Sequence, residues 1–151
     1  MKKFLPVVAL SLLAAACTSS TPSGMSRWME AYGNNFPVPQ PGLAAVYLVR
    51  GDAPQEAQAI NITRSGHPAG MVTPNTWLLF DLPPGYHDFR AVGTQESNEL
   101  IITTAPGETR FLMVSPTTPD NAELLELSSL EGRRLVYQGQ HMQELPDAHG
   151  R

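Results

Sequence analysis

The sequence predicts an all-β protein, an antiparallel β-sandwich of about seven strands with a short C-terminal helix. Three observations point to this fold class. Apolar residues in the middle of the chain form short runs, either alternating with polar residues or continuous, as in β-strands. The 14 prolines and 12 glycines separate these runs, which is typical of strands joined by tight turns. One polar capping pattern predicts a helix near the C-terminal end.

The first sixteen residues have the organisation of a secretory signal peptide. Two lysines follow Met1, residues 4–13 are apolar, and three alanines end the segment at Ala16. The apolar stretch is too short and too rich in alanine at its end for a good membrane-spanning helix. We therefore expect residues 1–16 to be a signal peptide that is cleaved between Ala16 and Cys17.

Cys17 is the single cysteine of the chain, so no disulfide forms within it. The run Ala14-Ala-Ala-Cys17 resembles the bacterial lipobox, although the lipobox prefers leucine where Ala14 stands. The resemblance implies that the Cys17 thiol carries a diacylglyceryl thioether and that the new amino terminus is acylated, which together give stable anchoring. With Thr18 after the cysteine, it also implies an outer-membrane location facing the periplasm. The alternatives are an ordinary signal peptide and an uncleaved anchor helix.

Residues 17–42 read as a lipidated cysteine followed by a flexible, proline-rich tether. Residues 18–24 are small and polar, as in flexible linkers. Residues 26–32 can make two helical turns with Trp28 and Tyr32 on one side, which either packs on the domain edge or contacts the membrane. Three alternating prolines then predict an extended segment.

The β-sandwich domain is predicted at residues 43–139. Its first strand is apolar on both faces and should be central, and most later strands alternate. The predicted strands are 43–50, 57–64, 67–72, 75–82, 86–94, 98–104 and 108–115.

Two proline-glycine turns separate the later strands. In Pro83-Pro-Gly85-Tyr86 and in Ala105-Pro-Gly107-Glu108, proline holds the second turn position and glycine the third. Type II turns favour this order, because proline presets φ and glycine accepts a positive φ.

The C-terminal end of the domain is predicted to be a helix. Ser128 and Glu131 form a capping-box pattern that begins a helix ending near Tyr137, in spite of Gly132 inside it. Residues 140–151 are polar and are expected to be a flexible tail.

The charge of the mature chain argues against nucleic-acid binding. Without Lys2 and Lys3, eight arginines face 14 carboxylates, a formal charge of −6. An acidic chain without lysine is a poor ligand for phosphate backbones, and its composition contains no polybasic run for an anionic membrane. Membrane attachment is therefore expected through the lipid.

No motif of the sequence indicates a cofactor, a metal or a catalytic centre. Nucleophile-elbow, zinc-protease and phosphate-loop patterns are absent. A hydrolase would require Ser65, His67, His87, Asp81 and Asp88 to converge. His87 near a strand start more simply bonds a turn carbonyl. The residues considered for a contact surface are Arg50, His87 and Arg90, and the large aromatic residues are expected in the core.

Three short motifs resemble a group of small bacterial lipoproteins that contain a domain of unknown function. They are Ala45-Val-Tyr-Leu-Val-Arg50, Leu82-Pro-Pro-Gly-Tyr-His87 and Gly107-Glu-Thr-Arg-Phe111. That domain looks similar to the small β-sandwich domains named for a Pro-Glu-Gly-Ala motif. The resemblance implies a fold and a location in the cell envelope, and it implies no reaction.

The expected function is therefore that of a non-catalytic lipoprotein of the cell envelope. Its domain would contact an envelope protein or give structural support, because exposed strand edges accept partner strands. A module that binds cell-wall glycan or peptide is the alternative, and it predicts exposed aromatic residues in one concave patch. An envelope hydrolase is a third hypothesis.

Overall fold

The computed structural model describes residues 31–51, 58–92, 99–118 and 121–145. Residues 31–34 are helical and are called α1. The other elements are β1 (Ala44–Arg50), β2 (Ile60–Arg64), β3 (His67–Val72), β4 (Thr76–Leu82), β5 (Gly85–Val92), β6 (Leu100–Thr104), β7 (Thr109–Thr118), β8 (Asn121–Leu127), α2 (Ser129–Gln138) and β9 (Gln140–His141).

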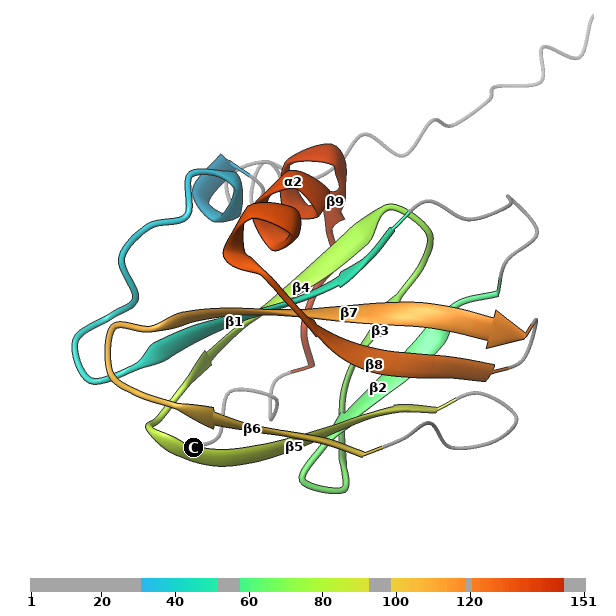
Figure 1. Cartoon of the computed structure of the whole chain (residues 1–151), viewed down its shortest axis with the longest axis horizontal. Coiled ribbons are helices and arrows are strands. Elements are labelled where there is room, and N and C mark those ends of the chain that lie inside the picture. Colours follow the sequence, from blue (N-terminus) through green and yellow to red (C-terminus); the bar gives the residue numbers. More distant parts are fainter. Residues whose placement is uncertain (1–30, 52–57, 93–98, 119–120, 146–151) are drawn as a thin grey trace, which may run out of the picture.

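The described strands form two sheets that pack face to face, which confirms the predicted sandwich. Sheet A has the order β8-β7-β1-β4-β9, and sheet B has the order β3-β2-β5-β6. The apolar core between the sheets is fully buried and includes Leu48, Phe80, Phe89 and Leu112. Both helices lie over the outer face of sheet A, so the molecule has three layers (Figure 1).

The seven predicted strands correspond to β1–β7, and the central position of the first is confirmed. Every residue of β1 is buried between β4 and β7. The pairing is mainly antiparallel, as predicted, and β1 with β7 and β4 with β9 are parallel pairs. After β4 the chain forms β5 and β6 of sheet B. It then returns to sheet A as β7, on the side of β1 opposite β4.

The described part of the chain has two strands that the sequence did not predict. In β8, Ala122 and Leu124 are buried while Leu125 is half-exposed, so consecutive leucines obscured the alternation. The predicted flexible tail is also corrected for residues 140–145. They include β9, and the amide of Met142 donates to Trp77 O at 2.8 Å while the amide of Leu145 donates to Ala69 O at 3.1 Å. Residues 146–151 lie outside the described residues.

The predicted helix is confirmed as α2. Ser128 is its N-cap, and its side chain accepts a hydrogen bond from the amide of Glu131 at 3.3 Å. The Ser128 hydroxyl in turn donates to Glu131 Oε2 at 2.8 Å. This pairing satisfies an amide that the first turn of a helix leaves without a partner.

The two proline-glycine turns differ. At Gly107 φ is 77°, and the amide of Glu108 donates to Ala105 O at 3.1 Å, as in the predicted type II turn. At Gly85 φ is 136°, a conformation that still requires glycine, but Gly85 already belongs to β5. Between β2 and β3, Ser65 and Gly66 have φ of 50° and 74°, the pair of positive angles of a type I′ hairpin.

Part of the predicted tether packs on the domain. Tyr32 and Phe36 lie against an aromatic cluster on the outer face of sheet A that consists of Tyr47, Trp77 and Phe111. The hydroxyl of Tyr47 donates to Gly33 O at 3.0 Å. The prediction of a flexible tether is therefore corrected for residues 31–36, whereas the predicted packing of Tyr32 on the domain is confirmed. Residues 17–30 lie outside the described residues, and Trp28 is among them.

Candidate functional site

The residues of the predicted lipid anchor precede the described part of the chain. Ala16 and Cys17 belong to residues 1–30, which the structure does not describe. Within the described residues, no helix has both the length and the apolar character needed to cross a bilayer. The structural account of a functional site therefore concerns the folded domain.

Arg50 is buried and does not belong to a contact surface. Its residue is 3 % exposed at the end of β1. Its Nη1 donates to Gln58 O at 2.6 Å and to Val72 O at 3.3 Å, and burial lowers the pKa of the guanidinium. Arg50 thus joins the end of β1 to the segment before β2 and to the last residue of β3, and its expected role in surface contact is corrected.

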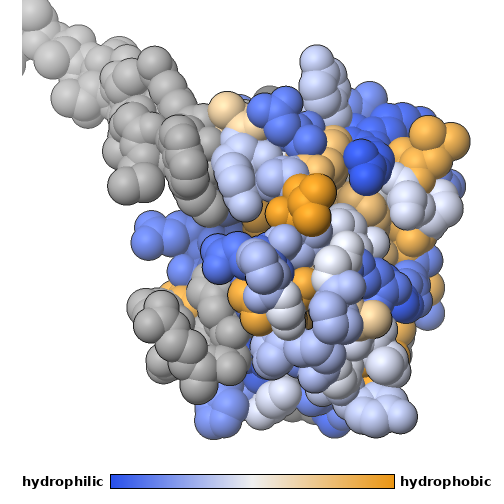
Figure 2. All heavy atoms as spheres, turned by 90° about the vertical axis from the view of Figure 1, so that its left-hand side faces the viewer, coloured by the Kyte–Doolittle hydropathy of each residue, from blue (hydrophilic) through white to orange (hydrophobic). Residues whose placement is uncertain are grey.

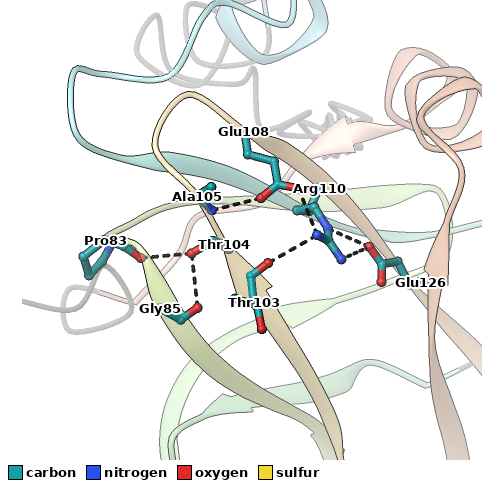
Figure 3. Close-up of polar contacts among 8 residues, drawn as sticks. All are labelled: Pro83, Gly85, Thr103, Thr104, Ala105, Glu108, Arg110 and Glu126. Carbon is teal, nitrogen blue, oxygen red and sulfur yellow. Dashed lines mark hydrogen bonds and ion pairs between the residues drawn. The ribbon is translucent and has the colours of Figure 1, made fainter.

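His87 is also internal. It is 6 % exposed, and its Nε2 lies 2.8 Å from Pro83 O. A carbonyl oxygen only accepts, so Nε2 carries the hydrogen. The hydroxyl of Thr104 donates to the same oxygen at 3.0 Å (Figure 3). The interpretation of His87 as the partner of a turn carbonyl is confirmed, and its place on a contact surface is corrected.

Of the three contact residues predicted, Arg90 lies on the surface. It belongs to the outer face of sheet B, which we define by Tyr86, Asp88 and Arg90 of β5 with Ile101 and Thr103 of β6. Arg90 Nη2 pairs with Glu99 Oε1 at 2.9 Å, and both side chains are more than one third exposed. An exposed pair of this kind adds little stability.

Two large side chains give the outer face of sheet B its apolar character. Tyr86 is 81 % exposed and Ile101 is 60 % exposed. In the register of β5 and β6, Tyr86 lies opposite Thr103 and Ile101 lies opposite Asp88, so the two apolar side chains are diagonal neighbours. The helices cover sheet A, whereas sheet B presents this face outward (Figure 1).

The residues that a hydrolase would require are divided between two faces. His87 points into the core, and the adjacent Asp88 belongs to the outer face of sheet B. His67 is exposed at the start of β3, opposite Arg64. Nor do three or more His, Cys, Asp or Glu side chains gather as metal ligands within the described ranges.

The expected placement of the large aromatic residues in the core is confirmed. Each of them is 0–1 % exposed: Tyr47, Trp77, Phe80, Phe89 and Phe111. The strongly exposed aromatic side chains of the described residues are Tyr86 and Tyr137, and they lie on sheet B and on α2. Figure 2, which looks at the left-hand side of Figure 1, shows apolar groups separated by hydrophilic ones.

Sequence reasoning missed the network around Arg110, which joins the two sheets at one edge (Figure 3). Arg110 Nε donates to Glu126 Oε1 at 2.6 Å, and Nη1 donates to Glu108 Oε1 at 2.9 Å and to Thr103 O at 3.2 Å. The amide of Ala105 donates to Glu108 Oε2 at 2.9 Å. This amide, followed by Arg110, lowers the pKa of Glu108.

This network is structural in character, because the Arg110 guanidinium donates to Thr103 of β6, to Glu108 in the turn before β7 and to Glu126 of β8. No short sequence signal could have identified it, since Arg110 and Glu126 are 16 residues apart. Nor could the sequence identify the side of α2 that faces outward, because this depends on how the helix packs on sheet A.

Comparison with known proteins adds no relative. No protein-family model, no curated protein and no solved structure matches this chain.

Proposed function

We propose that this chain is a non-catalytic lipoprotein of the bacterial cell envelope, held to the outer membrane by lipid on Cys17 with its domain in the periplasm. One observation carries the proposal: the only cysteine follows a positively charged start, an apolar segment and three alanines. Lipidation gives this cysteine a chemical role. Two or three acyl chains give stable anchoring where one chain does not.

The folded domain is proposed to act by contact with another envelope protein or as structural support. The supporting observation is the outer face of sheet B, where Tyr86 and Ile101 are strongly exposed. The sequence resemblance to small lipoproteins with a domain of unknown function agrees with this proposal and provides no reaction.

Replacing Cys17 by serine tests the anchor. We expect wild-type protein to incorporate labelled palmitate and to fractionate with membranes, because acyl chains partition into the bilayer. Cys17→Ser should incorporate no label and should be released as a soluble envelope protein. Ser19→Ala is a matched control, since it alters the neighbouring segment and keeps the cysteine.

Mass spectrometry of the processed wild-type chain gives the decisive result. The proposal requires an amino-terminal Cys17 with the added mass of its acyl groups. An unmodified thiol at that position, or a chain that still begins with the leader, would refute lipid anchoring.

A further inference from the structure

The outward face of α2 carries exposed apolar side chains. Leu130 is 81 % exposed and Tyr137 is 76 % exposed, while Gly132 and Val136 on the other side of the helix are buried against sheet A. Leu130 and Tyr137 are seven residues apart, so they lie two turns apart on one side, with Arg134 between them. We call Leu130, Arg134 and Tyr137 the outward face of α2.

This face also carries positive charge. Within the described part of the chain, neither Arg133 nor Arg134 forms an ion pair, whereas Arg90 and Arg110 are paired with glutamates. Arg133 lies at the flank, with its guanidinium 4.7 Å from the centre of the Phe36 ring. Two arginines thus stand beside two apolar side chains on a chain that is acidic as a whole.

The chain enters the domain next to α2. Phe36 contacts Arg133 of α2, and the segment before it belongs to the same helical layer over sheet A (Figure 1). Thirteen residues, 18–30, lie between Cys17 and Ala31, and a segment of this length spans at most about 50 Å when fully extended. Because the described chain begins in the helical layer, a lipid on Cys17 lets this layer reach the bilayer.

We propose that the outward face of α2 rests on the phospholipid surface of the membrane to which Cys17 anchors the chain. This inference depends on the proposed lipid anchor. Tyrosine suits the headgroup region, where its apolar ring and polar hydroxyl are both accommodated, and leucine suits the adjoining boundary of the acyl chains. Arginine pairs with lipid phosphates through its planar fork of donors. The anchor makes the contact intramolecular, so a small face suffices.

The proposal assigns an orientation to the whole domain. Sheet A separates the helical layer from sheet B, so the outer face of sheet B points away from the membrane when α2 lies on it (Figure 1). Tyr86 and Ile101 are then presented to the periplasm, where a partner protein can reach them.

Fluorescence quenching by lipids tests this orientation. The native lipoprotein, whose Cys17 is acylated, is purified as Tyr137→Cys or Tyr86→Cys, and the new thiol is labelled with one environment-sensitive fluorophore. Each is reconstituted into vesicles of three parts phosphatidylethanolamine and one part phosphatidylglycerol, containing nitroxide-labelled lipid. The two tyrosines are matched in exposure, at 76 % and 81 %. We expect loss of most fluorescence at position 137 and none at position 86.

The contribution of charge is tested in the labelled Tyr137→Cys background. Arg134→Gln should weaken the quenching on vesicles with phosphatidylglycerol, and Arg90→Gln on sheet B should leave it unchanged. Unchanged quenching in Arg134→Gln would overturn the part of the proposal that assigns headgroup binding to this arginine. Thermal melts of each variant exclude a loss of fold as the cause.

The outcomes separate this inference from the anchor itself. If the native chain floats with vesicles but positions 137 and 86 are quenched equally or not at all, the orientation is wrong and the anchor stands. Crosslinking of position 137 to a second copy without lipid quenching would assign the face to self-association and overturn the proposal. A chain that does not float overturns both the orientation and the anchor.

Discussion

Gly132 in the middle of α2 lies against the ring of Phe111 in β7. A Cβ atom at Gly132 would come within 2.2 Å of Phe111 Cγ, closer than real atoms approach. Glycine in a helix interior costs about 1 kcal/mol relative to alanine. The residue that weakens the helix locally is therefore the one that lets it approach sheet A closely.

Gly132→Ala should destabilise the domain although alanine is the better helix former. The added methyl group must displace Phe111 or lift α2, and overpacking of this kind costs about 1–3 kcal/mol. Chemical denaturation measures the free energy of unfolding. In the background of Phe111→Ala, which removes Cγ and Cδ1 of the ring, the same substitution should cost less, and equal costs in both backgrounds would contradict the contact.

Gly85→Val should destabilise the domain by about 1–3 kcal/mol, because a φ of 136° is strained for any side chain. Space is not the cause, since no atom lies within 4 Å of a Cβ built at Gly85. The matched control is Gly51→Ala, where a Cβ would meet only Leu135 at 3.8 Å. A thermal melt of Gly85→Val that coincides with wild type would disprove the strain.

Tyr47 should make stability decline at alkaline pH. Burial, followed by the nearby Tyr32 and Asp81, raises the pKa of Tyr47 far above its ordinary value of about 10. The folded protein keeps the phenol neutral while the unfolded chain ionises. The stability that this group contributes is therefore complete below about pH 10 and is lost as pH rises above it.

Denaturation at several pH values, with Tyr47→Phe as the comparison, isolates this effect. The variant should lose about 1 kcal/mol at neutral pH, because Gly33 O loses its hydrogen bond from the Tyr47 hydroxyl. Its free energy of unfolding should also fall less at alkaline pH than that of the wild type, because the phenol that causes part of the fall is absent. An identical pH profile in both proteins would show that the phenol titrates normally.

Glu144 should hold the C-terminal segment on the domain. Its Oε1 accepts from the amide of Leu79 at 2.5 Å and lies 3.0 Å from His141 Nε2. Glu144→Ala leaves a part-buried amide without its acceptor, which costs about 1–3 kcal/mol. Hydrogen exchange should accelerate at Leu79 and across β9. The exposed Glu123→Ala is the control, and equal exchange in both variants would contradict the role of Glu144.

The sequence alone was sufficient for the elements that local rules specify. The apolar run of Ala44–Arg50 predicted a central strand, the order Pro-Gly predicted the turn at Gly107, and Ser128 with Glu131 predicted the start of α2. The positive φ of Gly85 was predicted in the same way. In each case the information lies within a few residues, because side-chain period, φ preference and capping act over one or two turns of chain.

The tertiary structure decided what depends on residues far apart in the chain. From the sequence Arg50 is expected at the surface, but two carbonyl oxygens near the end of β1 accept hydrogen bonds from its guanidinium. The sequence predicts a flexible tail from residue 140, but the carbonyl oxygens of Trp77 and Ala69 accept hydrogen bonds from the amides of Met142 and Leu145. In the sequence Gly132 only weakens the helix, whereas in the structure its missing side chain leaves room for Phe111. Local sequence specifies conformation, whereas burial and partner choice follow from packing between distant segments, which no local pattern contains.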